Sequence, residues 1–146
     1  MRKTALLLLA AALLSACGTT GDLYSWGGYR NKTSAYEDYA YQYYHRQTPE
    51  SLCDLLACYE QMVSTPGGSR QVPPPGICAE YGYLLLLPET AVTFMNHASA
   101  SQKRLFQTGD FAGLFQERGK EMLQMEIELY PESAIFIRPL IKKLVK

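Results

Sequence analysis

The sequence FAGLFQERGKEMLQMEIEL, residues 111–129, decides the fold class of this chain. Its apolar residues recur every three or four positions, which is the spacing of one face of an α-helix. Charged side chains fill many of the positions between them, as expected where the opposite face of a helix meets water. The apolar stripe consists of Phe111, Leu114, Phe115, Met122, Met125 and Leu129. The stretch therefore predicts a long helix with one face on an apolar core.

Signals on both sides bound this helix and predict another after it. Asp110 can cap the first turn, and Pro131 stops the helix soon after residue 129. Residues 133–145 then predict a final helix. The side chains expected on its core face are Phe136, Leu140, Ile141 and Leu144.

The preceding chain predicts two helices separated by a short turn. In the tyrosine-rich residues 36–46, helical spacing puts Tyr36, Tyr39 and Tyr43 on one face. A second helix is predicted to start after Thr48, which can cap it, with Pro49 at the first helical position.

Two further apolar stretches fill the middle of the chain. Residues 77–87 predict a buried helix, although residues 81–87 alone would also fit a strand. Residues 89–107 predict one less regular helix. Together these patterns predict an all-α fold, a small single-domain helical bundle over residues 36–146.

The N-terminus has the layout of a bacterial secretory signal. Arg2 and Lys3 supply the positive charge, residues 5–14 the apolar core, and Ser15 and Ala16 the small residues before a cleavage site. The apolar run is far shorter than the ~20 residues of a spanning helix. Residues 1–16 are therefore predicted to be a signal peptide that is removed.

The end of this signal resembles the lipobox of bacterial lipoproteins, in which Leu and two small residues precede a cysteine. Here the residues are Leu14, Ser15, Ala16 and Cys17. The resemblance implies cleavage before Cys17, acylation of its thiol and amine, and a stable lipid anchor. Gly18 in place of Asp implies the outer membrane, at its periplasmic face. Residues 17–35, rich in Gly, Thr, Ser and Asn, are expected to be this lipidated cysteine and a flexible tether.

The other three cysteines suggest one disulfide in an oxidising compartment. Cys53 and Cys58 are five residues apart, about 140° around a helix, so they point in different directions. A bond from Cys78 to Cys58, or alternatively to Cys53, is the better prediction. The competing interpretation is three buried free thiols. A metal site is not expected, because neither a Cys-x-x-Cys pair nor a histidine cluster accompanies them.

Part of the pattern is similar to a tetratricopeptide unit, which is two antiparallel helices joined by a tight turn. Residues 79–83, Ala-Glu-Tyr-Gly-Tyr, look like the first-helix signature, and residues 109–111 and Pro131 look like the turn and the terminal proline. Residues 88–108 intervene where that repeat has only a short turn. The resemblance therefore implies tetratricopeptide-like helix-turn-helix packing within the bundle, without a repeat array.

The whole mature chain is similar to a family of small proteobacterial lipoproteins known as domain of unknown function 4810. The matching residues are Leu23, Tyr24, Trp26, Gly27 and Tyr29; Pro75 and Gly76; 79–82; and 130–133. Genes of that family tend to lie beside one for a curli-secretion-channel-like lipoprotein and another small lipoprotein. The resemblance implies a shared envelope assembly, and it carries no catalytic residues.

The Tyr- and Trp-rich N-terminal segment is the best candidate for a binding site. Tyr and Trp combine large contact area with low rotamer cost, which suits interfaces. We expect Tyr24, Trp26 and Tyr29 to bind partners, namely other envelope lipoproteins. The alternative is a peptidoglycan or glycan ligand stacked on the same rings.

Composition and motifs argue against two other classes of function. The 14 basic and 14 acidic residues balance, so the chain has no basic field for nucleic acid. Neither His45 nor His97 is placed by the sequence beside a cysteine as a nucleophile–base pair. We therefore expect a non-enzymatic protein without cofactors, apart from the acyl chains on Cys17.

Overall fold

The computed structural model describes residues 21–30 and 32–145, which form one small all-α domain. This confirms the fold class expected from the sequence. The elements are β1 (Tyr29–Arg30), β2 (Thr33–Ser34), α2 (Ala35–Arg46), α3 (Pro49–Ser64), α4 (Ile77–Leu85), α5 (Thr90–His97), α6 (Ala100–Phe106), α7 (Phe111–Leu129), the 3-10 turn η1 (Pro131–Ser133) and α8 (Ala134–Leu144).

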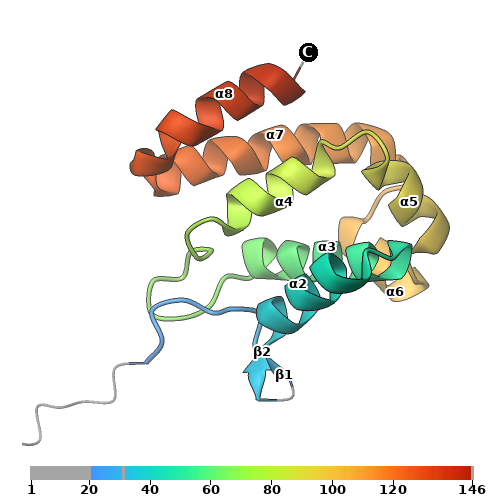
Figure 1. Cartoon of the computed structure of the whole chain (residues 1–146). Helices are drawn as coiled ribbons and strands as arrows, with labels where there is room; N and C mark the ends of the chain where they lie inside the picture. Colours follow the sequence, from blue (N-terminus) through green and yellow to red (C-terminus); the bar gives the residue numbers. More distant parts are fainter. Residues whose placement is uncertain (1–20, 31, 146) are drawn as a thin grey trace, which may run out of the picture.

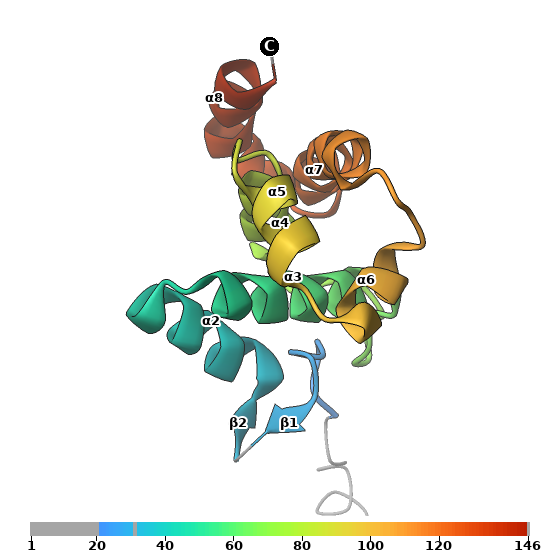
Figure 2. The ribbon, with the colours of Figure 1, turned by 90° about the vertical axis from the view of Figure 1, so that its right-hand side faces the viewer.

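The helices stack in an order that runs from one end of the molecule to the other. The β1–β2 hairpin and α2 lie at one end, and α3 lies next to α2 (Figure 1). The paired helices α4 and α7 follow, and α8 lies on the far side of them (Figure 2). Because α3 contacts α2, α4, α5 and α6, it is the central helix of the domain.

Local capping explains where the main helices begin. The Thr48 hydroxyl accepts the Ser51 N–H at 3.2 Å, and the Ser51 hydroxyl accepts the Thr48 N–H at 3.1 Å. This reciprocal capping box starts α3 where the sequence predicts it. Asp110 caps α7 by accepting the Gly113 N–H at 2.9 Å.

Two glycines allow α4 and α7 to approach each other closely. A Cβ atom at Gly82 would lie 2.8 Å from the Gly119 carbonyl oxygen, and one at Gly119 would lie 2.6 Å from Leu86 Cγ. These distances are shorter than van der Waals contact, so no side chain fits at either position. The contact between the two helices is therefore backbone against backbone.

The core has an aromatic cluster at one end and tyrosines near its centre. Phe94, Phe106, Phe111 and Phe115 pack with ring centroids 4.9–6.4 Å apart, mostly in tilted or edge-to-face arrangements. The face of α2 that carries Tyr36, Tyr39 and Tyr43 packs against this core, as its spacing predicts.

The stretch 89–107 forms two helices, whereas the sequence predicts one. The backbone is extended at Ala98, and Ser99 starts α6 with a capping box to Gln102. The apolar spacing continues across this break because Phe94 and Phe106 both reach the same aromatic cluster. The periodicity of apolar residues therefore does not reveal the bend between α5 and α6.

The predicted core face of α8 is wrong at one position. Phe136 is 76% exposed, whereas its neighbour Ile137 is buried against Leu86 and Leu123. Leu140, Ile141 and Leu144 do pack against this small cluster, as predicted. The buried stripe starts at Ile137 and continues with the i+3, i+4 and i+7 positions, and Phe136 falls outside it at 100° per residue.

Candidate functional site

Residues 21–30 and 32–35, which the composition predicts to be part of a flexible tether, are hydrogen-bonded to the folded domain. The Asp22 and Leu23 carbonyls accept the N–H groups of Ser69 and Arg70 at 3.0 and 3.1 Å. The Trp26 carbonyl accepts the Tyr36 N–H at 3.1 Å. The segment is therefore held on one side by the loop after α3 and on the other by the start of α2.

Glycine is required at the turn that brings this segment to α2. Gly27 has a φ of +80°, and a Cβ there would lie 3.2 Å from Cys58 Sγ and 3.3 Å from Ala35 Cβ. The Gly28 carbonyl then accepts the Ala35 N–H at 2.8 Å. Tyr29 consequently enters the β1–β2 hairpin, where it pairs with Ser34.

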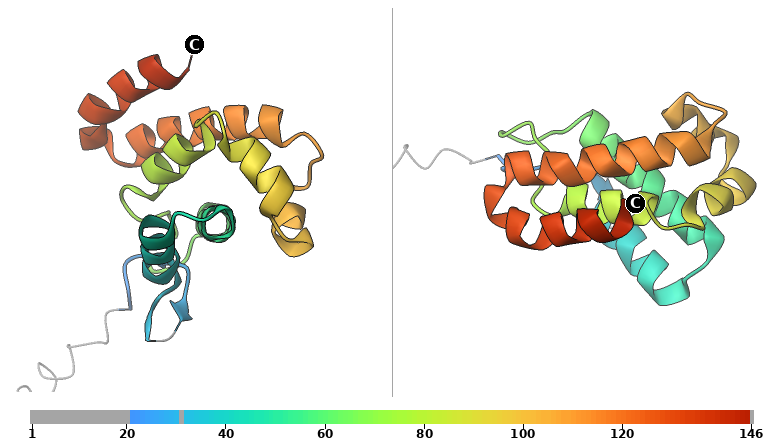
Figure 3. Two further views of the ribbon diagram at one scale, coloured as in Figure 1. Left: turned by 45° about the vertical axis from the view of Figure 1, so that its right-hand side comes forward. Right: turned by 90° about the horizontal axis from the view of Figure 1, so that it is seen from above.

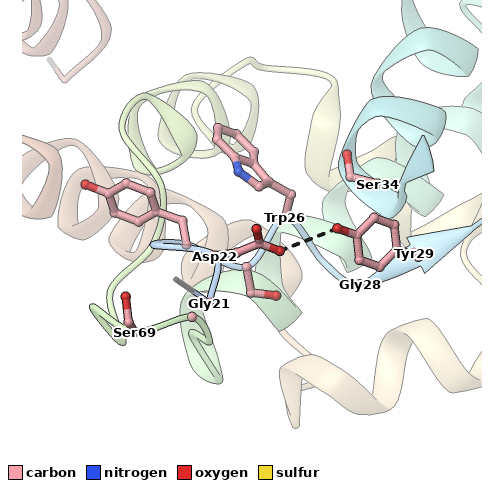
Figure 4. Close-up of a pocket in the computed structure, with 10 residues that line it drawn as sticks. Gly21, Asp22, Trp26, Gly28, Tyr29, Ser34 and Ser69 are labelled. Carbon is pink, nitrogen blue, oxygen red and sulfur yellow. Dashed lines mark hydrogen bonds between the residues drawn. The ribbon is translucent and has the colours of Figure 1, made fainter. Parts of the chain in front are cut away.

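The three aromatics predicted to form a binding site lie around one open hollow of about 420 Å³. Tyr24, Trp26 and Tyr29 line it together with Asp22, Ser34 and residues 68–69 (Figure 4). A second hollow of about 490 Å³ lies beside it and shares Trp26, Tyr29 and Ser34. The two large rings thus line both of these adjoining hollows, and we call them the Trp26–Tyr29 ridge.

Tyr24, Trp26 and Tyr29 differ in how much of each side chain is exposed and available for binding. Tyr24 is half-buried, and its hydroxyl accepts from Arg70 Nη1 at 2.7 Å while the guanidinium lies over its ring. Tyr29 is 82% exposed and Trp26 is 38% exposed. The Tyr29 hydroxyl makes only a long bond of 3.4 Å to Asp22. Tyr24 is therefore mainly a support, and the ridge offers the contact area.

A chain of aromatic rings connects Trp26 of the ridge to the core. Trp26, Tyr36, Tyr59 and Tyr81 follow one another with centroid separations of 5.5, 5.9 and 5.5 Å. Tyr59 and Tyr81 are fully buried. This support is not predictable from local sequence, because Tyr59 and Tyr81 belong to α3 and α4, far from Trp26 along the chain.

One carboxylate fixes two of these rings. Glu80 accepts from the Tyr36 hydroxyl at 3.0 Å and from the Tyr59 hydroxyl at 2.6 Å. Burial, followed by the adjacent Glu80 charge and hydrogen bond, raises the pKa of both phenols above the usual value for tyrosine. Both phenols therefore stay protonated as donors, and Trp26 is supported by a rigid surface.

The two histidines have ordinary neighbours. His97 Nδ1 lies 3.3 Å from Glu50 Oε1, and the His45 ring stacks on Tyr41 at 5.4 Å. Across residues 21–30 and 32–145, no cluster of His, Cys, Asp and Glu side chains has the arrangement of a metal site.

The predicted disulfide from Cys78 to Cys58 or Cys53 is absent, because all three are buried free thiols in the structure. The Cys58 sulfur lies 3.9 Å from Met62 Sδ, on the side of α3 that faces Gly27. Cys78 lies on α4, near Glu126 of α7. The sulfurs of Cys58 and Cys78 thus face different parts of the fold.

We expect these thiols to be unreactive until the protein unfolds. Burial raises the pKa of Cys53 and Cys58 to about 11 and, with Glu126, that of Cys78 to about 12. At pH 8 a pKa of 11 leaves about one thiolate in a thousand. In a Cys17→Ala chain, Ellman's reagent should detect almost no thiol before unfolding and three afterwards. Release of a single thiol without reductant would instead reveal a disulfide.

The predicted acylation site, Cys17, and the signal before it lie outside the described residues. Within the described part of the chain, the helices are all too short or too polar to cross a bilayer. Comparison of the chain with protein-family models, curated proteins and solved structures finds no significant match.

Proposed function

We propose that this protein is a non-enzymatic, lipid-anchored lipoprotein at the periplasmic face of a bacterial outer membrane, where its Trp26–Tyr29 ridge binds another protein of the envelope. The lipobox at residues 14–17 supports the anchor and the location. The partners proposed are other envelope lipoproteins, including a curli-secretion-channel-like protein. The observation that carries the binding role is an exposed Trp–Tyr pair held on a rigid base.

Several features of the ridge favour a protein partner. Hot spots of interfaces are enriched in Trp and Tyr, and they gain affinity when they are ordered before binding. The hydrogen bonds of residues 22, 23, 26 and 28, together with the tilted contact between the Trp26 and Tyr36 rings, hold the ridge in place. The hollows on either side would receive side chains of the partner.

The pair of helices α4 and α7 is proposed as the tetratricopeptide-like part of the bundle. Gly82 and Gly119 give the close approach of small residues that such a hairpin needs. The residues between α4 and α7 form α5 and α6, which close one end of the core. We propose that the α4–α7 pair is the scaffold that supports the ridge.

A second candidate ligand is peptidoglycan or another glycan. The hollow of about 490 Å³ combines the Trp26 and Tyr29 rings with the polar side chains of Lys32, Ser34 and Glu37, which would suit a sugar ring. Sedimentation with purified sacculi distinguishes a glycan ligand from a protein partner. A glycan binder would pellet with the sacculi, and a protein-binding subunit would stay in the supernatant.

Affinity capture tests the ridge directly. The lipidated protein would be purified from mildly solubilised envelopes, and its companions identified by mass spectrometry. We expect Trp26→Ala/Tyr29→Ala to lower partner recovery at least tenfold, because hot-spot truncation costs about 2 kcal/mol or more. The domain should stay folded, because Tyr29 is exposed and Trp26 loses only one ring contact.

The matched control is Tyr41→Ala/Tyr44→Ala, which removes two exposed rings from α2. This variant should recover partners as the unaltered protein does. Equal recovery by both double variants would contradict the assignment of the ridge. A large drop in melting temperature for Trp26→Ala/Tyr29→Ala would show that the two rings are part of the core.

A further inference from the structure

One of the two hollows at the ridge is lined by an acidic side chain and, among the described residues, by no basic one. Asp22 lines the hollow of about 420 Å³ together with the Trp26 and Tyr29 rings, and we call it the Asp22 hollow. The Asp22 side chain is exposed, and its carboxylate accepts a long hydrogen bond of 3.4 Å from the Tyr29 hydroxyl. The Asp22 hollow thus combines two large aromatic rings with a negative charge.

The fold does not neutralise this charge. In the described part of the chain, Asp22 forms no ion pair. Arg70, in the loop that holds this segment, donates to the Tyr24 hydroxyl at 2.7 Å and lies over the Tyr24 ring. The adjoining hollow of about 490 Å³ is lined by one charge of each sign, Lys32 and Glu37. Of the two hollows, the Asp22 hollow is therefore the one with an uncompensated negative charge.

The same domain already binds a guanidinium with this combination of groups. Arg30 Cζ lies 4.9 Å from the centre of the Tyr39 ring, and Arg30 Nε lies 3.2 Å from Asp38 Oδ2. An aromatic face and a carboxylate both attract a cation, and the flat guanidinium can stack on the first while it pairs with the second. Tryptophan is the strongest aromatic side chain in this interaction. The Asp22 hollow therefore has the chemistry that suits an arginine side chain.

We infer that the Asp22 hollow binds an arginine side chain of the partner protein, with its guanidinium against the Trp26 and Tyr29 rings and paired with the Asp22 carboxylate. The inference rests on the proposed function, since this arginine belongs to the protein that the ridge binds. An apolar side chain would remove water from the carboxylate without replacing its charge, which is costly. A lysine would supply the charge but not a flat group that bonds both carboxylate oxygens.

The position of the Asp22 hollow makes it accessible to a partner. The segment that carries it and the β1–β2 hairpin protrude beside α2 and α3 (Figure 3, left). The Asp22 carboxylate points toward the Tyr29 hydroxyl, with the Trp26 side chain close by (Figure 4). The Asp22 and Trp26 carbonyls accept the N–H groups of Ser69 and Tyr36, which holds the segment in place. An incoming arginine would therefore meet groups that are positioned before binding.

Titration of Trp26 fluorescence tests this contact in the full lipidated protein in detergent. Trp26 is the only tryptophan of the chain, so its emission reports on the hollow directly. The probes would be acetylated, amidated Gly-Arg-Gly and the matching citrulline peptide, in which a neutral urea replaces the guanidinium. We expect a saturable change with the arginine peptide and at least about tenfold weaker binding of the citrulline peptide.

The matched variants are Asp22→Asn and Glu117→Gln. Asp22→Asn should bind the arginine peptide at least about tenfold less tightly, because it removes the charge and keeps the shape of the side chain. It should stay folded, since the bond of Asp22 to Ser69 uses the backbone carbonyl. Glu117 is an exposed carboxylate on α7 that forms no ion pair in the described part of the chain. Glu117→Gln should therefore bind the arginine peptide as the unaltered protein does.

No saturable change with the arginine peptide, equal affinity for the two peptides, or unchanged affinity in Asp22→Asn would overturn the inference. Partner capture from envelopes then distinguishes its failure from that of the proposed function. Capture that is lost in Trp26→Ala/Tyr29→Ala but complete in Asp22→Asn would support the ridge and overturn the arginine contact. Complete capture by both variants would contradict the proposed function, and the arginine contact with it.

Discussion

We expect Arg118→Met to lower the free energy of unfolding by about 3 kcal/mol, because it leaves a buried carboxylate without its counter-charge. Arg118 Nη2 lies 3.0 Å from Glu60 Oε1, and its Nε donates to Glu60 Oε2 at 3.3 Å. The Glu60 side chain is only 12% exposed. Glu60 also accepts from the hydroxyl of the buried Tyr81 at 2.6 Å, so the carboxylate would keep its charge among largely buried groups. Urea unfolding at neutral pH measures the loss.

A second partner of Arg118 provides the matched control. Arg118 Nη1 also pairs with Glu121 at 2.9 Å, but Glu121 is 55% exposed, and such surface pairs contribute little. Glu121→Gln should therefore change stability by less than about 0.5 kcal/mol. Glu60→Gln/Arg118→Met should be more stable than Arg118→Met alone, since it removes the orphaned charge and keeps an acceptor for the Tyr81 hydroxyl. A loss of less than about 1 kcal/mol for Arg118→Met would show that the pair is effectively solvated.

We expect Gly82→Ala to lower the free energy of unfolding by about 3 kcal/mol, at the upper end for overpacking. The new Cβ would lie 2.8 Å from the Gly119 carbonyl oxygen, a backbone atom that cannot rotate away. To admit it, α4 and α7 must separate and loosen Leu123, which also lies close to the glycine. The gain in helix propensity, about 1 kcal/mol, is too small to offset this. Thermal and urea unfolding test the prediction.

Gly109→Ala serves as the control for this substitution. A Cβ at Gly109 meets nothing within 4 Å, so the change should leave stability within about 0.5 kcal/mol of the unaltered protein. Similar melting temperatures for the two variants would mean that α4 and α7 are not in backbone contact.

Local signals made most helices of the bundle predictable. Thr48 and Ser51 form the predicted start of α3, and Asp110 caps α7 as expected. Such caps act over three residues, so the sequence displays them directly. The bend between α5 and α6 was not predictable, because the aromatic residues of both helices point into one cluster. The helical spacing of apolar residues therefore continues across the bend.

Contacts between distant residues were not predictable in the same way. Residues 21–30 and 32–35 have the composition of a linker, yet hydrogen bonds to Ser69 and Arg70 and the turn at Gly27 hold the segment against the domain. The Tyr- and Trp-rich composition of residues 24–29 did identify three side chains that line one hollow. The hydrogen bond between Tyr24 and Arg70 joins residues far apart in the sequence, so the sequence could not show that only Trp26 and Tyr29 form the ridge.

Photo-crosslinking in living cells tests the binding role of the ridge most directly. A benzophenone-bearing phenylalanine analogue would replace Tyr29 on the ridge, or Tyr41 on α2 as the control, and both positions are exposed. We expect irradiation to produce a discrete protein adduct from position 29 and none of that mass from position 41. No specific protein adduct from position 29, or the same adducts from both positions, would contradict the proposal that the Trp26–Tyr29 ridge binds an envelope protein.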